Sequence, residues 1–161
     1  LRIYTHGDPL GVELSGATKN VIAIAAGICD GIQLGDNAKS AMLARGLAEI
    51  SRLGVAMGAK VETFFGIAGV GDLATTCFSP HGRNRTCGER LGRGEDLDTI
   101  QKTMGSVVEG VPTTKAVREL AEKFSVEMPI SEAIYQVLYE DLPLRGAIDS
   151  LMSRDLKAEK I

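Results

Sequence analysis

The sequence predicts an all-helical domain built on two long central helices, and three observations support this fold class. Residues 21–29 carry neither a charge nor a side-chain amide, which is typical of the buried half of a central helix. Apolar residues in the next segment recur at steps of three and four, the period of a helix. No stretch shows the alternation of apolar and polar residues that a half-buried strand needs. Aromatic residues make up only 4% of the chain, so the core must consist mainly of aliphatic side chains.

The two long helices are expected over about residues 11–28 and 38–57. Asp30-Gly31 ends the first, Gly35-Asp36-Asn37 begins the second, and Gly58 is the expected residue just after it. Five residues form the core-facing stripe of the second helix, namely Leu43, Leu47, Ile50, Gly54 and Met57. Three charged residues are expected to lie on a face other than this stripe and to pair with one another at i,i+4 and i,i+3 spacing, namely Arg45, Glu49 and Arg52. Gly46, Gly54 and several alanines would let another helix pack closely against this one.

The remaining elements are expected to be short, because glycine and proline divide the sequence after residue 58. Five short helices are expected over about residues 61–65, 72–78, 83–91, 96–104 and 114–124. Another helix is expected to open at Pro129 and to carry apolar residues as far as Leu138, and a last one is expected from Pro143 to about Met152. The expected loops are residues 66–71, 79–82 and 105–113. The polar tail 153–161 is expected to fray.

Composition excludes several classes of protein. The 161 residues suffice for one domain with its own core, and a net charge of −3 argues against a nucleic-acid or anionic-membrane binder. Uninterrupted apolar runs stay well short of the roughly 18 residues of a membrane span. Cys29, Cys77 and Cys87 are odd in number and widely spaced, which favours reduced thiols in the cytoplasm. Cys77, His81 and Cys87 lack a clear fourth ligand, so we expect no metal site.

Several familiar catalytic motifs are absent from the sequence. A Gly-x-Gly-x-x-Gly segment after a strand does not occur, so this chain should not cradle a dinucleotide by itself in the usual way. His6 and His81 are far apart and have no obvious carboxylate partner. The chain begins without Met and without a signal-peptide pattern, and we expect it to be part of a longer protein.

Lys19 is the first candidate for a catalytic residue. It stands directly before Asn20 and the apolar run 21–29, at the boundary between water and a low-dielectric interior. Partial desolvation disfavours a charged ammonium, which is how lysines come to act as general bases. A solvated structural lysine is the alternative, and residue chemistry alone favours it.

Three further features make a functional site more plausible in combination. Glycine-rich residues 69–71 precede Asp72, which could also be a simple helix cap. Residues 77–93 hold four arginines and one acid, a local charge of +3 that is consistent with phosphate binding or with a solvated helix face. Glu109 follows two valines in an expected loop, where it could accept hydrogen bonds from a ribose or be a plain surface acid. A base, two acids and an anion loop would suit a phosphorylated substrate whose hydroxyl loses a proton.

The motifs that carry these residues resemble the NAD(P)-dependent glycerol-3-phosphate dehydrogenase family. They are residues 11–27, Gly69-Val-Gly71-Asp72-Leu73, Arg83-Asn84-Arg85 and Val107-Val108-Glu109-Gly110. The resemblance covers essentially the whole chain, in order and with compatible spacing. It implies that residues 1–161 are a single substrate-binding helical domain, similar in fold to the C-terminal domain of 6-phosphogluconate dehydrogenase. The N-terminal Rossmann domain would then lie outside this chain, in agreement with the missing glycine fingerprint.

The resemblance also implies the substrate and the residues that bind it. Lys19 would exchange a proton with the C2 oxygen as sn-glycerol 3-phosphate and dihydroxyacetone phosphate are interconverted, and Asp72 would orient Lys19 or the substrate. Arg83 and Asn84 would bind the phosphate. The family usually has a serine where this chain has Gly82, whose backbone N–H could serve instead.

Cofactor and cellular role follow from the same resemblance. NAD or NADP would be bound mainly by the absent domain, with contacts from Arg83, Val107 and Glu109. The enzyme would be cytoplasmic and would feed glycerophospholipid synthesis, and the isolated chain would be inactive because half of its cleft is missing. A homodimer is a candidate assembly.

Two other functions fit parts of the sequence. The first is a C-terminal domain of another lysine-dependent dehydrogenase acting on a different hydroxy acid or sugar, although the Arg83-Asn84 pair argues for a phosphate. The second is a non-catalytic helical dimerisation module, in which the small residues of the second helix contact a partner helix.

Overall fold

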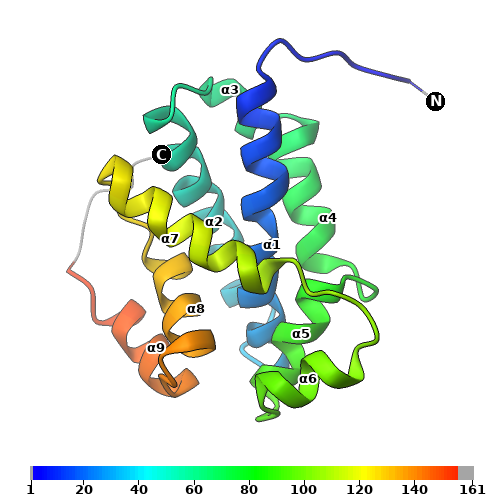
Figure 1. Cartoon of the computed structure of the whole chain (residues 1–161), viewed down its shortest axis with the longest axis vertical. Coiled ribbons are helices and arrows are strands. Elements are labelled where there is room, and N and C mark those ends of the chain that lie inside the picture. Colours follow the sequence, from blue (N-terminus) through cyan, green and yellow to red (C-terminus); the bar gives the residue numbers. More distant parts are fainter. Residues whose placement is uncertain (1, 156–161) are drawn as a thin grey trace.

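α1 (Pro9–Gly31) runs through the middle of the domain in the computed structural model, which describes residues 2–155 (Figure 1). Val21, Ile22 and Ile24 in its second half have no exposed surface. The helices that pack directly against it include α2 (Asp36–Ala56), α4 (Asp72–Phe78), α5 (Arg83–Gly92), α7 (Gly110–Phe124) and α8 (Pro129–Tyr139). The predicted all-helical fold with two long helices is confirmed, and residues 2–155 contain no strand.

Shorter elements complete the domain. They are α3 (Val61–Phe64), the π-helical turn η1 (Ile67–Gly71), α6 (Leu97–Thr103) and α9 (Leu144–Met152). Residues 2–7 form an extended arm that leaves the body of the molecule (Figure 1). Of the tail that was expected to fray, residues 156–161 lie outside the described part of the chain.

Length and mean hydropathy alone would allow α1 to cross a membrane. Most of this apolar stretch is nevertheless covered by the surrounding helices, and the core helix of a helical domain passes the same test of length and composition. The uninterrupted apolar runs of the sequence are shorter than this stretch, which includes the charged residues Glu13 and Lys19.

Glycines bring α1 and α5 into direct backbone contact. A Cβ added at Gly27 would lie 1.9 Å from the carbonyl oxygen of Arg85, and one at Gly88 would lie 2.0 Å from that of Ile24. Side chains at these positions would therefore force the helices apart. Close packing at α2 is also confirmed, since Gly46 faces Ile22 and Gly54 faces Phe64.

Asp8 fixes the beginning of α1, a role that sequence analysis did not assign. Its carboxylate accepts hydrogen bonds from the Gly11 N–H at 3.1 Å, the Lys60 N–H at 2.8 Å and the Thr63 hydroxyl at 2.6 Å. The bond from Thr63, followed by the two backbone bonds, lowers the pKa of Asp8. The first turn of α1 is thereby tied to α3.

Two segments that were expected to be loops are partly helical. Residues 66–71 were predicted to be a glycine-rich loop, but residues 67–71 form the π-helical turn η1 that continues into α4. The loop predicted over residues 105–113 ends early, because α7 begins at Gly110. Pro112 lies in the first turn of α7, where its missing N–H leaves no intrahelical hydrogen bond unmade.

The expectation that Glu49 lies on a face away from the core is wrong. Glu49 is only 1% exposed and points away from water, toward the beginning of α8. Its carboxylate accepts hydrogen bonds from the N–H groups of Ile130 and Ser131, at 2.6 and 3.1 Å, and from the Ser131 hydroxyl at 3.1 Å. The free N–H groups of α8 supply the partners that make burial of this acid tolerable.

Candidate functional site

Lys19 of α1 and Asp72 of α4 form an ion pair that joins two segments 53 residues apart. Their side chains keep 20% and 40% of their surface exposed, so a ligand can reach both. The Asp72 side chain caps no helix, because it is directed to Lys19 rather than to the first N–H groups of α4. The simple cap considered from the sequence is therefore excluded.

The π-helical turn before α4 delivers Asp72 to this pair. Gly69 in this turn packs so tightly on α3 that an added Cβ would lie 2.1 Å from the carbonyl oxygen of Phe64. Only glycine fits so close to another backbone. Gly69 thus serves packing, and the turn that contains it places Asp72 at the first residue of α4.

Arg83 and Glu109 form a second ion pair, between α5 and the residue that precedes α7. The Arg83 guanidinium lies 3.3 Å from a Glu109 carboxylate oxygen, and about half of each side chain is exposed. Val107, two residues before Glu109, is 67% exposed. These predicted cofactor-contact residues lie at an accessible surface.

Asn84 connects three helices at the floor of the site. Its side-chain N–H₂ donates to the Asn20 side-chain oxygen at 2.9 Å, and its own oxygen accepts the Gly110 N–H at 2.8 Å. The residue is buried, and one hydrogen of its amide remains for a ligand. A Cβ at Gly110 would lie 2.7 Å from the Asn20 carbonyl oxygen, which explains the glycine there.

Asn20 is a site residue that sequence analysis did not single out. It follows Lys19 directly, and its amide side chain also lies 3.4 Å from the Gly16 carbonyl oxygen. Its position beside Lys19 was the available signal. Its partner Asn84 is 64 residues away, so the contact could not be read from spacing.

Gly82 has a partner within the chain. Its backbone N–H, considered as a substitute for the family's serine hydroxyl, donates to the Ser79 carbonyl oxygen at 3.2 Å. The backbone at Gly82 is extended, so its dihedral angles do not require glycine, and a Cβ there would lie 3.3 Å from the carbonyl oxygen of Thr76. This N–H could reach a phosphate only by leaving or sharing that bond.

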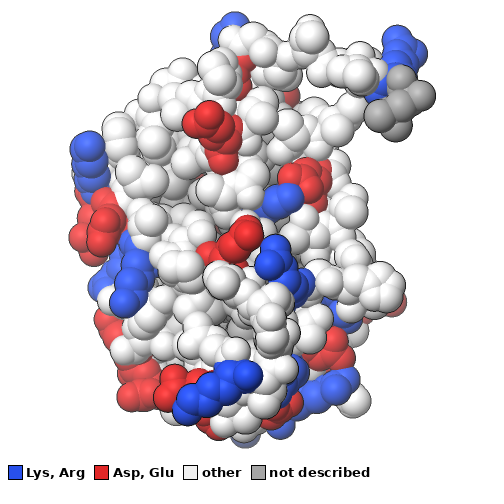
Figure 2. All heavy atoms as spheres, turned by 45° about the vertical axis from the view of Figure 1, so that its right-hand side comes forward, with Lys and Arg blue, Asp and Glu red and all other residues white. Residues whose placement is uncertain are grey.

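Of the four arginines between residues 77 and 93, only Arg83 belongs to the candidate site that contains Lys19. The other three pair with acids elsewhere, Arg85 with Asp30 and Glu89, Arg90 with Glu95, and Arg93 with Glu89. Charges of both signs are interspersed over the face shown in Figure 2, which lacks a broad basic patch. The local charge of +3 seen in sequence is thus largely compensated in space.

The three cysteines are buried free thiols. Burial raises the pKa of Cys77 to about 12 and that of Cys87 to about 11, and it also raises the pKa of Cys29. Protonated, buried thiols are poor nucleophiles and poor metal ligands. No group of three or more His, Cys, Asp or Glu residues suited to a metal ion occurs within residues 2–155.

The arrangement can exchange a proton and hold an anion at neighbouring places. An amine paired with a carboxylate, as in Lys19 with Asp72, is chemically able to exchange a proton, and the guanidinium of Arg83 and an amide hydrogen of Asn84 are groups able to donate to a phosphate. The Asn20–Asn84 hydrogen bond holds the two parts together, since Asn20 adjoins Lys19 and Asn84 adjoins Arg83.

Comparison with known proteins identifies close relatives. A family model described as NAD-dependent glycerol-3-phosphate dehydrogenase C-terminus matches residues 8–149. A glycerol-3-phosphate dehydrogenase (NAD(P)+) of Listeria monocytogenes serotype 4b is 54% identical over 160 residues, which cover 99% of this chain and 47% of the relative. An enzyme of the same name from Geobacillus thermodenitrificans is 56% identical over 158 residues, covering 98% of this chain and 46% of the relative.

Solved structures agree with the sequence comparisons. A glycerol-3-phosphate dehydrogenase from Coxiella burnetii superposes with a TM-score of 0.92 at 44% identity, over 95% of this chain and 47% of that one. The Saccharomyces cerevisiae enzyme gives a TM-score of 0.82 at 34% identity, over 92% of this chain and 45% of that one. The chain therefore spans about half the length of the curated relatives it matches.

Proposed function

Because this chain belongs to the family of C-terminal domains of NAD-dependent glycerol-3-phosphate dehydrogenases, we propose that it supplies the proton-transfer and phosphate-binding groups for interconversion of sn-glycerol 3-phosphate and dihydroxyacetone phosphate. The observation that carries the proposal is the accessible Lys19–Asp72 pair, linked through Asn20 and Asn84 to Arg83.

We propose that NAD or NADP binds mainly to a separate domain outside this chain. The relatives are about twice as long, and this chain has no glycine fingerprint of its own. The accessible Arg83, Val107 and Glu109 suit the edge of such a site, since a carboxylate can accept from ribose hydroxyls and a guanidinium can donate to phosphate. When bound, the nicotinamide supplies the acceptor or donor of the hydride at C2.

Lys19 accepts or donates the proton of the reaction. In the oxidation direction its neutral amine accepts the C2 hydroxyl proton, and in the reduction direction its ammonium gives that proton to the C2 oxygen. Asp72 holds the Lys19 amine in place and stabilises its charged form. An ammonium next to the C2 oxygen also stabilises negative charge that develops there.

Arg83 orients the substrate through its phosphate. Its guanidinium can exchange the exposed Glu109 carboxylate for a phosphate, with which it can form two parallel hydrogen bonds. Binding energy gained at the phosphate then holds C2 beside Lys19.

The test is consumption of NAD(P)H with dihydroxyacetone phosphate by the full-length protein and two variants. We expect Lys19→Ala to lower kcat by about 10²–10⁴-fold, while Lys102→Ala on α6, exposed and outside the site, leaves it unchanged. Survival of turnover in Lys19→Ala would remove Lys19 as the proton-transfer group. Absence of turnover in the wild-type protein would overturn the proposed substrate.

A second variant separates this proposal from a dehydrogenase of another substrate class. We expect Arg83→Ala to raise KM for dihydroxyacetone phosphate by about 10–100-fold, the value of a charge-assisted hydrogen-bond pair. Arg93→Ala is the matched control, because Arg93 directly follows the same helix and pairs with Glu89. An unchanged KM in Arg83→Ala would favour a substrate without a phosphate.

The cellular role and assembly extend the proposal. A cytoplasmic enzyme that feeds glycerophospholipid synthesis agrees with three free, buried thiols. A homodimer and an inactive isolated chain stay predictions, which light scattering and an activity assay of residues 1–161 would test.

A further inference from the structure

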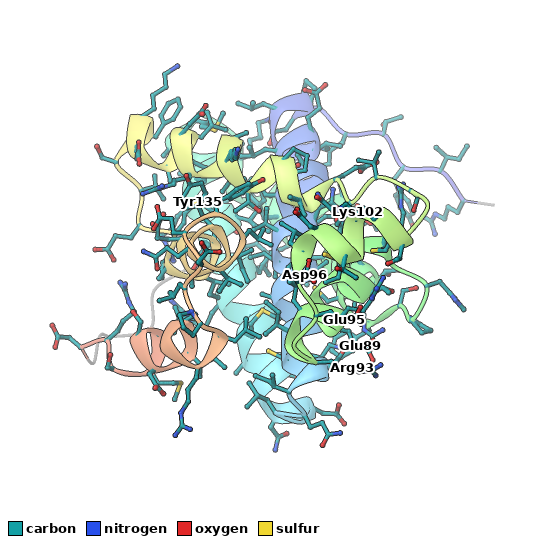
Figure 3. All side chains as sticks on the ribbon, turned by 60° about the horizontal axis from the view of Figure 1, so that its bottom comes forward. Glu89, Arg93, Glu95, Asp96, Lys102 and Tyr135 are labelled. Atoms are coloured by element: carbon teal, nitrogen blue, oxygen red, sulfur yellow. The ribbon has the colours of Figure 1, made fainter. Side chains whose placement is uncertain are left out.

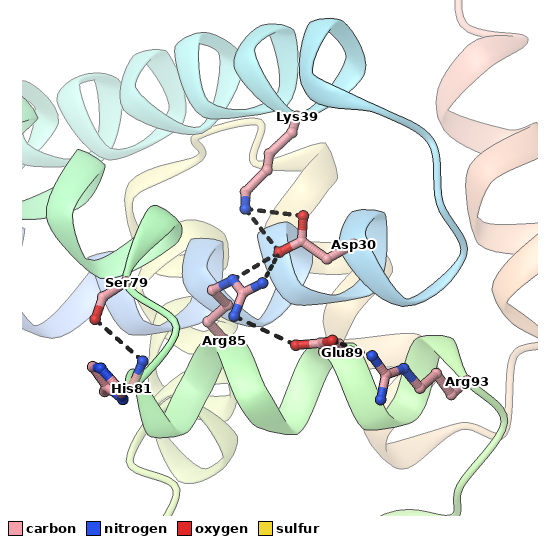
Figure 4. A network of polar contacts seen from close by, with 7 residues as sticks. All are labelled: Asp30, Lys39, Ser79, His81, Arg85, Glu89 and Arg93. Atoms are coloured by element: carbon pink, nitrogen blue, oxygen red, sulfur yellow. Dashed lines mark hydrogen bonds and ion pairs between the residues drawn. The ribbon is translucent and has the colours of Figure 1, made fainter.

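A cluster of charges joins the far end of α1 to α2 and α5. Figure 4 shows Asp30 of α1 between Lys39 of α2 and Arg85 of α5. The Lys39 amine lies 2.9 and 2.7 Å from the two Asp30 oxygens, and Arg85 reaches one of them through two nitrogens, at 2.7 and 2.6 Å. One carboxylate thus holds two cations from two different helices.

This cluster differs from an ordinary surface ion pair. The Lys39 side chain is 6% exposed and that of Arg85 is 15% exposed, so solvent screens their interactions with Asp30 weakly. Glu89 lies 3.4 Å from Arg85 on its other side and also holds Arg93. Removing the Asp30 charge would leave Lys39 and Arg85 facing each other without their shared counter-ion.

The cluster lies where α1 and α5 touch through their backbones. Gly27 faces the backbone of residues 85–89 and Gly31 faces that of residues 89–92, so the two helices run in the same direction. Glycines permit this closeness, but they offer no side chain that would stop one helix from sliding along the other. Asn20 with Asn84 supplies one directional connection across that contact, and Asp30 with Arg85 supplies a second one about three turns further along α1.

The two helices also carry the two halves of the proposed site. Lys19 and Asp30 lie on the same side of α1, because eleven residues make three turns, or roughly 16 Å. Arg83 lies two residues before Arg85 on α5. The register between α1 and α5 therefore sets the separation between the proton-transfer group and the phosphate-binding group.

We propose that Asp30 is a positioning residue that, through Arg85 and Lys39, fixes this register and thereby the length of substrate that the site accepts. The inference rests on the proposed function, because it concerns a substrate that spans Lys19 and Arg83. A ligand that occupies only the phosphate position does not depend on the register.

The experiment compares Asp30→Asn with the wild-type full-length protein, using three ligands. They are dihydroxyacetone phosphate, its homologue 1,4-dihydroxybutan-2-one 4-phosphate with one more methylene before the phosphate, and inorganic phosphate as inhibitor. We expect kcat/KM for dihydroxyacetone phosphate to fall about tenfold or more, since a misplacement of about 1 Å can cost 10²-fold. We expect the preference for the shorter substrate to shrink at least threefold, and the inhibition constant of inorganic phosphate to change less than twofold.

Glu95→Gln provides the matched control. Glu95 pairs with Arg90 of α5, at 3.0 Å, and Figure 3 shows it near Glu89 and Arg93 at the C-terminal end of that helix. This variant removes one carboxylate that pairs with α5 without touching the contact to α1, so the length preference should stay as in the wild type. If Asp30→Asn folds poorly, Arg85→Lys keeps the charge but loses the two-nitrogen contact, and it should show the same loss of preference.

The outcomes separate the inference from its premise. If wild-type turnover is present and Asp30→Asn lowers activity equally on both substrates with the preference intact, Asp30 only stabilises the fold and the inference is overturned. A rise in the inhibition constant of inorganic phosphate parallel to KM would also overturn it, because the phosphate position itself would then have been damaged. Absence of wild-type turnover would instead refute the proposed function.

Discussion

Replacing Glu49 with alanine tests the hydrogen bonds that this buried acid makes at the beginning of α8. No side chain of α8 or of the residue before it caps this helix, so Glu49 of α2 acts as the cap across the domain. Alanine would leave the N–H groups of Ile130 and Ser131 without an acceptor in a dry environment. Each unsatisfied buried donor costs about 1–3 kcal/mol, so we expect the free energy of unfolding to fall by about 2–5 kcal/mol.

The assay is urea-induced unfolding of the chain at neutral pH, followed by far-ultraviolet circular dichroism. Glu119→Ala is the matched control, because Glu119 is an exposed glutamate within α7 and its loss should change stability by less than about 0.5 kcal/mol. A loss at Glu49→Ala no larger than that of the control would refute the reasoning, since the cap would then contribute nothing measurable.

Glu49→Gln adds a test of pH dependence. Burial raises the pKa of Glu49, although the hydrogen bonds from Ile130 and Ser131 oppose the rise. The folded state thus binds this proton more tightly than the unfolded state. The stability that this proton binding adds is fully present below the ordinary pKa of 4.5 and is lost as pH rises through the folded pKa. The free energy of unfolding of the wild type minus that of Glu49→Gln should therefore decrease as pH rises above about 4.5. A constant difference would contradict this reading.

Three other expectations follow from the packing and the site. Gly88→Ala, whose Cβ would lie 2.0 Å from the backbone of α1, should destabilise the chain by more than about 2 kcal/mol, whereas Gly16→Ala has open space and should stabilise it by up to about 1 kcal/mol; thermal unfolding of both variants checks the sign. Because burial raises the pKa of Cys77 to about 12 and of Cys87 to about 11, a thiol reagent at about pH 8 should label the native chain far more slowly than the unfolded chain. Rapid labelling without denaturant would contradict the burial. Gly82→Ser in the full-length protein adds a hydroxyl beside the proposed phosphate position and should lower KM for dihydroxyacetone phosphate by about 2–10-fold; an unchanged KM would show that no phosphate lies within reach of this position.

The helices could be predicted because their signals are local. The apolar run 21–29 and the three-and-four spacing of the second helix depend only on neighbours within two turns. The errors arose where a distant contact overrides the local pattern. Glu49 looks like a surface residue until α8, 81 residues later, brings its free N–H groups to it.

Sequence motifs could select the candidate site residues, but they could not show how these residues are arranged in space. Motifs drew attention to Lys19, Asp72, Arg83 and Glu109, and the structure pairs them two by two. These pairs join segments 53 and 26 residues apart, and nothing in the spacing indicates which acid meets which base. The connecting role of Asn20 was missed for the same reason.

Burial separates the arginines of one short segment into two kinds. Arg83 and Glu109 are each about half exposed, and an exposed ion pair contributes about 0–1 kcal/mol, so a phosphate can displace the carboxylate at little cost. Arg85 is mostly buried against Asp30, where losing the partner would strand a poorly solvated charge. The Arg83–Glu109 pair is therefore suited to separate when a phosphate binds, and the Arg85–Asp30 pair is suited to stay intact during binding. Arg83 and Arg85 have the same chemistry and lie two residues apart, but positions at this spacing on a helix face different surroundings. Arg83 can therefore bind a ligand, while Arg85 supports the packing of the helices.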